Sequence, residues 1–156
     1  IDERFESDGT SYKATADDTA YALFELENGV IAQINSSWVT RVRRDDLFVM
    51  QVDGTKGTAV AGLRDLYQQH YFSTPRPVWN PDIDSPLNYF DDWMKMPVYE
   101  EHDNAFKIQW EKFIRHIVAD EPFPWDLHEA AKGVQLAELA LESTEKRIWI
   151  DVPDLK

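Results

Sequence analysis

The sequence predicts an α+β fold, with an open, mostly antiparallel sheet, two main helices on one of its faces, and the other face available for subunit packing. Three observations indicate this fold. Apolar and polar residues alternate through much of residues 18–72, which is the period of β-strands. Apolar residues recur at helical spacing from residue 106 onward. Strand-type segments come first and helix-type segments follow, an order typical of α+β proteins.

The first expected element is a long antiparallel hairpin. Its first strand begins at residue 18, and one side of it is apolar: Ala20, Ala22, Phe24 and Leu26. Asn28-Gly29 supplies a turn that tolerates positive φ, and the returning strand covers residues 30–41.

The returning strand has two unlike faces. One carries Val30, Ala32, Ile34, Ser36 and Trp38, and the other carries Ile31, Gln33, Asn35 and Ser37. The second face is polar but uncharged, although the chain is rich in charge. We therefore expect a second copy or a neighbouring domain to cover it. The expected interface residues are Tyr21, Gln33, Asn35, Ser37, Val49 and Gln51.

Further strands are expected to continue the same sheet as a meander: residues 46–52, 58–63 and 66–72, with a short last strand at 148–152. The helices can cover only the apolar side of such a sheet. The side chains expected beneath them are Phe24, Ile34, Phe48 and Met50.

Two helices follow. Asp103 or Asn104 can cap the first, which ends near Asp120 and carries one apolar stripe. The second begins at Asp126, where Asp-Leu-His-Glu resembles a capping box. The first stripe consists of Phe106, Trp110, Phe113, Ile114 and Ile117.

Residues 73–102 form a long connection with five of the eight prolines and several aromatic residues. A long loop in a compact domain is usually functional or packed by its own side chains. An exposed Trp79 beside Asn80 would suit stacking on a sugar ring and hydrogen bonding to its hydroxyls. The alternative is a loop held over the sheet by Trp79.

A dense cationic cluster follows the hairpin, at Arg41, Arg43 and Arg44. Guanidinium groups can clamp a carboxylate or phosphate. The alternative is pairing with Asp45, Asp46 and neighbouring acids. Together with the loop, the cluster gives these candidate substrate-binding residues: Arg41, Arg43, Trp79 and Asn80.

Composition narrows the function classes. The net charge of -13 argues against nucleic acid as a partner, because phosphate binding needs a surplus of Lys and Arg. No apolar run is long enough to span a membrane. The absence of Cys excludes disulfides and, with no targeting signal, predicts a cytoplasmic location. The chain begins with Ile rather than Met, so we expect a fragment of a longer protein.

No motif supplies a cofactor or metal site. Neither Gly-x-Gly-x-x-Gly nor a phosphate-binding loop occurs, so no cofactor-binding residue is assigned. His128-Glu129-Ala-Ala-Lys132 places Lys where a zinc-protease helix needs a second His. The four histidines show no metal-ligand spacing.

Three segments in order carry a family resemblance: ADDTAYALFELENGVIAQINSSW, LFVMQVDGTKGTAVAGL, and the stretch from DNAFKIQWEKF to RIWIDV. Over about residues 16–152 the chain resembles the C-terminal domain of the Gfo/Idh/MocA oxidoreductases. The resemblance implies a parent protein with its own N-terminal Rossmann domain that binds NAD or NADP. In that family this second domain shapes the substrate pocket and assembles subunits sheet against sheet.

The family transfers hydride at a carbinol carbon of a sugar or polyol, with a Lys in the cofactor domain and often an Asp and His on a helix that this chain lacks. No catalytic residue is therefore carried over. We expect residues 1–156 to be a single α+β domain, the substrate-binding and oligomerisation part of an NAD(P)-dependent sugar or polyol dehydrogenase, and inactive when isolated. The alternative is a non-catalytic carbohydrate-binding or protein-interaction scaffold.

Overall fold

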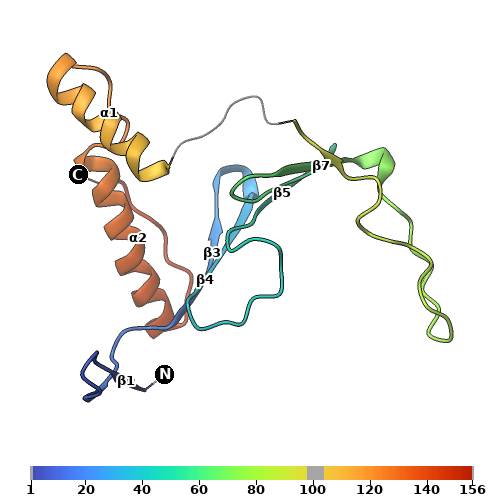
Figure 1. Cartoon of the computed structure of the whole chain (residues 1–156), viewed down its shortest axis with the longest axis horizontal. Coiled ribbons are helices and arrows are strands. Elements are labelled where there is room, and N and C mark those ends of the chain that lie inside the picture. Colours follow the sequence, from blue (N-terminus) through green and yellow to red (C-terminus); the bar gives the residue numbers. More distant parts are fainter. Residues whose placement is uncertain (1, 98–103, 156) are drawn as a thin grey trace. The chain divides into compact units, whose positions relative to one another are not determined.

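The computed structural model describes residues 2–97 and 104–155 (Figure 1). The chain divides into two compact units, the first formed by Ile1–Thr40 with Asn104–Lys156 and the second by Arg41–Asp103. Strands occur in both units, and both long helices belong to the first. The expected α+β class, with open antiparallel sheets, is confirmed.

The first unit contains two separate antiparallel hairpins, β1 (Glu3–Phe5) with β2 (Ser11–Lys13) and β3 (Thr19–Glu25) with β4 (Ile31–Ser37). The longer hairpin confirms the prediction, and its turn has positive φ at Asn28 (64°) and Gly29 (74°). The shorter hairpin was not predicted, because its strands are brief and lack apolar alternation.

The register of the longer hairpin fixes which side chains share a face. Tyr21 lies opposite Asn35, and Leu23 lies opposite Gln33. Residues directly opposite one another in an antiparallel pair project from the same side. The polar, uncharged row of β4 therefore faces the same side as Thr19, Tyr21 and Leu23 of β3, and the charged Glu25 lies at the turn end of this face, opposite Ile31.

The two helices are α1 (Ala105–Ala119) and α2 (Leu127–Lys146). Asn104 caps α1 by accepting a hydrogen bond from the Phe106 amide at 2.9 Å, and Asp126 caps α2 through the Glu129 amide at 2.9 Å. Asp120 ends α1 in a left-handed conformation. Both predicted helices are confirmed, while the alternative cap Asp103 lies outside the described residues. Neither helix is long and apolar enough to cross a membrane in the described part of the chain.

The second unit is built on a four-stranded antiparallel sheet whose strands lie in sequence order. The strands are β5 (Met50–Gly54), β6 (Gly57–Ala61), β7 (Leu66–His70) and β8 (Met94–Lys95). The first three correspond to the predicted strands with shifted ends. The two-residue β8 was missed, because it lies inside the proline-rich connection and is too short to show a period.

The predicted continuous meander is wrong, because β3–β4 and β5–β8 form separate sheets. The intervening segment uses its hydrogen-bonding groups locally. The Arg44 guanidinium donates to the backbone oxygens of Asp46 and Leu47, and the Ser37 hydroxyl accepts from the Thr40 amide. Backbone groups satisfied in this way do not extend a ladder.

The predicted strand at residues 148–152 is also absent from the described structure. The chain is instead held at the end of α2. The Ile148 amide donates to the Ser143 carbonyl at 3.3 Å, and the Ser143 hydroxyl donates to the Ile148 carbonyl at 2.6 Å.

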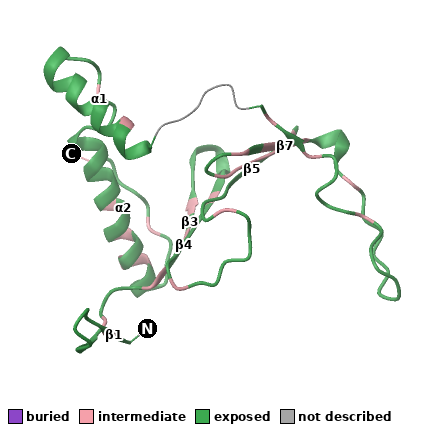
Figure 2. Cartoon of the chain, in the orientation of Figure 1, coloured by how far each residue is buried: buried purple, intermediate pink, exposed green. Residues whose placement is uncertain are grey.

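The described residues include no fully buried side chain, and Figure 2 shows only the intermediate and exposed classes among them. Phe24 is half-buried, as the hairpin pattern suggested. Ile34 is 55% exposed, so its predicted burial beneath the helices of the first unit is not observed. Phe48 and Met50 belong to the second unit, and their predicted burial beneath the helices stays a prediction. A two-stranded hairpin or a small sheet has too little area to enclose a core by itself.

Candidate functional site

The proline-rich connection of the second unit leaves from the end of β7, and its far end pairs with that same strand. After β7, the short turn η2 (Tyr71–Ser73) leads outward, and the chain returns as β8, which pairs with β7. The Tyr71 amide donates to the Lys56 carbonyl at 3.0 Å and fixes the outgoing end. Residues 74–93, here called the 74–93 loop, are therefore an excursion from one sheet edge (Figure 1).

Short local bonds shape this loop. The Asn80 side-chain oxygen accepts from the Asp82 amide at 3.0 Å, and the Asn88 side-chain oxygen accepts from the Phe90 amide at 3.2 Å. The Trp93 indole donates to the Tyr89 carbonyl at 3.1 Å. Turns of this kind, with prolines between them, restrict the backbone without a packed core.

Trp79 is 84% exposed, so its ring faces are open for stacking. The interpretation in which Trp79 holds the loop over the sheet does not fit this exposure. The half-buried tryptophan near the loop is Trp93, which lies next to β8. Sequence reasoning identified an aromatic loop but did not distinguish these two roles.

Arg41 and Arg43 have no hydrogen bond or ion pair recorded among the described residues, whereas Arg44 is bound to backbone oxygens. Pairing of the cluster with Asp46 is not observed. Asp46 instead accepts from the Leu63 amide at 2.6 Å, and this bond is the main cause of the lowered pKa of its carboxyl group. The two free guanidinium groups remain able to bind an anionic or polyhydroxylated ligand.

The four predicted substrate-binding residues all belong to the second unit, at 41–43 and 79–80. The structure records no contact between the arginines and the Trp79–Asn80 pair among its described residues. Their joint action in one pocket therefore stays a prediction.

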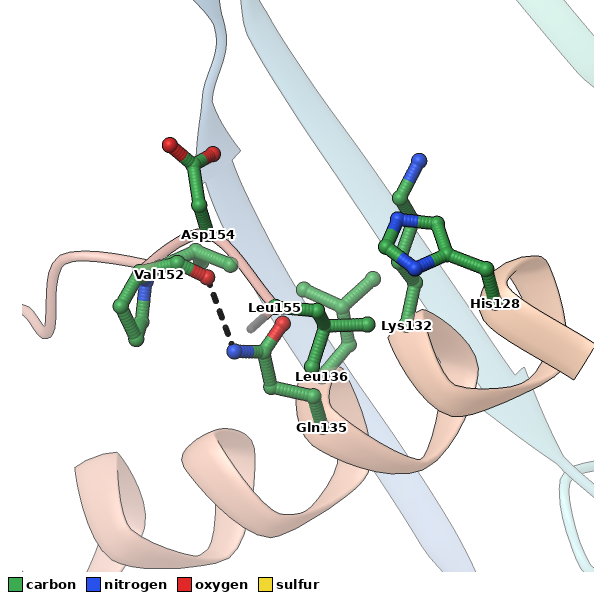
Figure 3. Close-up of a pocket in the computed structure, with 8 residues that line it drawn as sticks. His128, Lys132, Gln135, Leu136, Val152, Asp154 and Leu155 are labelled. Carbon is green, nitrogen blue, oxygen red and sulfur yellow. Dashed lines mark hydrogen bonds between the residues drawn. The ribbon is translucent and has the colours of Figure 1, made fainter.

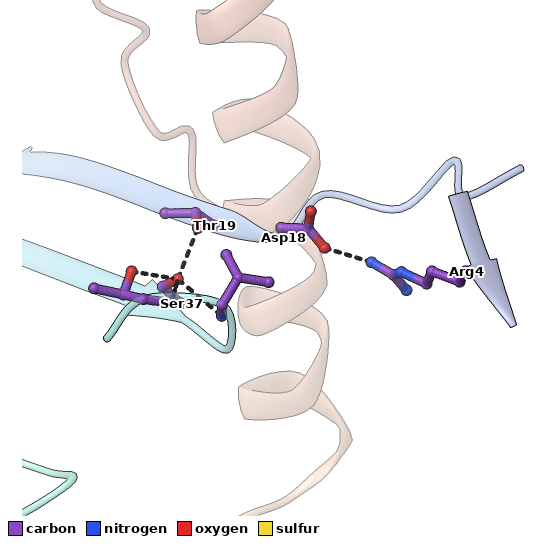
Figure 4. Close-up of polar contacts among 6 residues, drawn as sticks. Arg4, Asp18, Thr19 and Ser37 are labelled. Carbon is purple, nitrogen blue, oxygen red and sulfur yellow. Dashed lines mark hydrogen bonds and ion pairs between the residues drawn. The ribbon is translucent and has the colours of Figure 1, made fainter. Parts of the chain in front are cut away.

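The predicted interface residues of β3 and β4 lie on an exposed face. Tyr21 is 71% exposed, and the Gln33 amide group donates to the Asn35 side-chain oxygen at 3.3 Å. The Ser37 hydroxyl lies 2.7 Å from that of Thr19 across the hairpin (Figure 4). These paired side chains carry no charge, and Glu25 is the charged residue of this hairpin face, at its turn end.

Val49 and Gln51 belong to a different sheet region from Gln33 and Asn35, so the six predicted interface residues do not share one sheet face. Val49 precedes β5 and is 44% exposed. Gln51 lies on β5 and donates to Asp53 at 3.0 Å, and the Thr58 hydroxyl donates to the same carboxylate at 2.8 Å. These two hydrogen bonds hold the pKa of Asp53 below its usual value.

Arg4 makes a contact that sequence reasoning missed. Its guanidinium binds the Asp18 carboxylate at 2.5 Å (Figure 4) and lies 4.4 Å from the ring centre of Trp38. The contact joins the β1–β2 hairpin to one end of the β3–β4 hairpin, where Trp38 directly follows β4. No sequence spacing signals it, because the three residues meet only after both hairpins form.

A hollow of about 400 Å³ lies beside α2 in the first unit (Figure 3). His128 and Lys132 line it from one helix face, and Gln135 donates to the Pro153 carbonyl at 2.9 Å. The Lys132 ammonium binds the Glu129 carboxylate at 2.8 Å, and this contact raises the pKa of Lys132. No group of three metal-ligating side chains occurs among the described residues.

The glycines of the second unit do not form a dinucleotide site. Such a cofactor needs a glycine-rich turn between a strand and a helix N-terminus. Gly54 and Gly57 instead join β5 to β6, and a Cβ on Gly57 would lie 2.4 Å from the Gln69 carbonyl oxygen. These two glycines of the described part of the chain therefore do not form a dinucleotide cradle.

The described residues thus combine open antiparallel sheets, two capped helices and an exposed aromatic loop, an arrangement of the α+β class. The chain belongs to the Gfo/Idh/MocA family, described as "Oxidoreductase family, C-terminal alpha/beta domain", which matches residues 2–152. It is also 50% identical to a D-xylose dehydrogenase of Paenarthrobacter nicotinovorans over 159 aligned residues. That alignment covers 99% of this chain and 41% of the length of the relative.

Proposed function

We propose that this chain is the substrate-binding and subunit-assembly domain of an NAD(P)-dependent sugar or polyol dehydrogenase. The observation that carries the proposal is the similarity to D-xylose dehydrogenase along 99% of the chain, together with the family match over residues 2–152. A single α+β domain extending over the chain, working with its own N-terminal Rossmann domain, accounts for both. A cytoplasmic location and use of NAD or NADP belong to the same proposal.

The substrate part of the proposal rests on the second unit. An indole that is 84% exposed can cover the apolar face of a sugar ring, and the neighbouring Asn80 can exchange its local bond for a hydroxyl. Arg41 and Arg43 offer donors without recorded partners among the described residues. Neutral polyhydroxylated ligands need this combination of a flat apolar surface with several donors.

The assembly part rests on the exposed sheet faces. Tyr21, Gln33 and Asn35 form a surface whose polar groups are already paired with one another or uncharged. Burying such a surface costs less than burying charged side chains. A second copy of the chain, packed sheet against sheet, is the proposed cover.

The proposal predicts that the isolated chain does not turn over a sugar with NAD or NADP, because hydride transfer requires the nicotinamide beside the reacting carbon. Turnover would be followed by absorbance of the reduced cofactor with a panel of pentoses, hexoses and polyols. Activity from the 156-residue chain would contradict the proposed division of labour.

Trp79→Ala in the full-length protein is expected to raise KM for the sugar by about 3- to 10-fold, the size of one lost aromatic contact. Arg43→Ala is expected to raise KM in the same direction. Trp149→Ala removes another exposed tryptophan, in the first unit, and serves as the control with unchanged kinetics. Sugar binding without any turnover by the full-length protein would favour the carbohydrate-binding scaffold instead.

A further inference from the structure

The 74–93 loop is held closed at its base by contacts between β8 and β7. Tyr67 lies opposite Lys95, and Gln68 lies opposite Met94. The Met96 amide adds a hydrogen bond to the Leu66 carbonyl at 2.8 Å. Because β8 has only two residues, this ladder by itself is a short anchor for a long excursion.

Lys95 strengthens that anchor with its side chain. Its ammonium binds the Asp65 carboxylate at 2.5 Å and lies 5.7 Å from the ring centre of Tyr67. Asp65 and Tyr67 flank the start of β7, so both contacts join the returning end of the loop to the strand from which the loop departs. The hydrogen bond to Asp65, together with the negative charge of that carboxylate, raises the pKa of Lys95.

The loop has little else to fix its position. Its recorded hydrogen bonds link residues close in sequence, and several of its apolar side chains are largely exposed: Val78, Trp79, Ile83 and Phe90. Its direction therefore depends on its two ends. At the outgoing end, the Tyr71 amide is bound to the Lys56 carbonyl. At the returning end, Lys95 makes the side-chain contacts.

We propose that Lys95 is a positioning residue, which closes the base of the 74–93 loop through Asp65 and Tyr67 and thereby sets the position of Trp79 for sugar binding. The part of this inference that concerns sugar binding rests on the proposed function. The closure of the loop by Lys95 does not depend on any substrate. Lys95 does not act on the substrate itself. It acts through the loop.

The closure is tested by hydrogen exchange in the full-length protein. Lys95→Met keeps the aliphatic stem and removes the charge, so the Met96 amide should exchange up to about fivefold faster. Lys95→Arg should restore the original rate. The matched control is Lys107→Met, which removes an exposed lysine from an i,i+4 pair with Glu111 on α1, where both side chains have exposures similar to those of the Lys95 pair.

The positioning role is tested by steady-state kinetics. Lys95→Met should raise KM for the sugar two- to fivefold with kcat nearly unchanged, because the loop contributes binding that is equal in the ground and transition states. Asp65→Asn should change KM in the same direction, and the double variant should be no worse than Lys95→Met, since Lys95→Met already removes the Lys95–Asp65 ion pair.

The outcomes separate the two proposals. If Trp79→Ala raises KM while Lys95→Met matches Lys107→Met in both exchange and KM, the positioning role is wrong and the proposed function stands. If Lys95→Met speeds Met96 exchange without changing KM, Lys95 closes the loop but does not position the sugar site, and the inference is overturned. If Trp79→Ala leaves KM unchanged, the proposed sugar site is wrong, and unchanged Met96 exchange would then overturn the closure as well.

Discussion

At the residue scale, the helix starts and tight turns follow from local chemistry. Asn104 and Asp126 place a side-chain oxygen where the first helical amides need an acceptor. Asn28 and Gly29 occupy positive φ with little steric cost. These features were predictable because each depends on only a few neighbouring residues.

Asp126 gives a prediction about pH. The Glu129 amide, ahead of the His128 amide and nearby positive charge, lowers the pKa of Asp126 from the ordinary value of 3.8. A lowered folded-state pKa adds stability above pH 3.8, and this contribution is lost as the pH falls through the folded-state pKa. Asp126→Asn keeps an oxygen cap but no titrating charge. The stability difference between wild type and variant should therefore shrink as the pH falls from 5 to below 3.8.

Unfolding by urea, followed by circular dichroism at several pH values, measures this difference. Asp82→Asn is a suitable control, because only the Asp82 backbone amide is hydrogen-bonded and its carboxylate has no recorded bond among the described residues. A wild-type advantage over Asp126→Asn that stays constant from pH 7 to pH 3 would contradict the assigned role of the carboxylate.

At the element scale, the ends of a strand depend on its neighbouring strands, which the alternation of apolar and polar residues does not reveal. β6 lies between β5 and β7 in the four-stranded sheet and is half-buried along its length, while those two neighbours are more exposed. β8 forms because β7 offers an edge, although the segment has no strand period of its own. The segment 148–152 has a strand-like composition but no recorded ladder, and Ser143 binds its first residue instead.

Gly57 gives a prediction for the second unit. Its φ is 154°, and a Cβ would lie 2.4 Å from the Gln69 carbonyl oxygen. Gly57→Ala must therefore shift the β6–β7 ladder, and we expect a loss of roughly 1–3 kcal/mol in unfolding free energy. Gly133→Ala in α2 has open space around the new methyl group. That control should gain up to about 1 kcal/mol.

Thermal and urea unfolding of both glycine variants checks this contrast. Equal stabilities for Gly57→Ala and wild type would mean that the β6–β7 approach is looser than the structure shows. A destabilised Gly133→Ala would contradict the open surroundings of that glycine.

At the scale of the whole molecule, many apolar side chains are exposed. This exposure is consistent with the proposal that a second subunit or another domain covers part of the surface. The proposed cover of the β3–β4 face can be tested directly. Asn35→Arg places a charge on that face, and it should weaken self-association by about tenfold or more, because an unpaired charge would be desolvated. Ser36→Arg places the same charge on the reverse face of the same strand.

Light scattering and sedimentation over a range of protein concentrations measure the association. Weaker association for Asn35→Arg alone supports the face proposed here. Equal association of both variants would mean that subunits meet elsewhere, and a larger effect of Ser36→Arg would assign the interface to the reverse face.

The residue patterns were enough to predict the family, the α+β class, both helices, the Asp126 cap, and the Asn28-Gly29 hairpin with the polar, uncharged face of its returning strand. Each of these depends on interactions within a few residues or on one continuous period. Tertiary structure alone decided that β3–β4 and β5–β8 are separate sheets, that β8 closes the 74–93 loop, and that Arg4 meets Asp18 and Trp38. Those contacts join residues distant in sequence, and the choice among possible partners depends on which backbone groups and side chains are already satisfied.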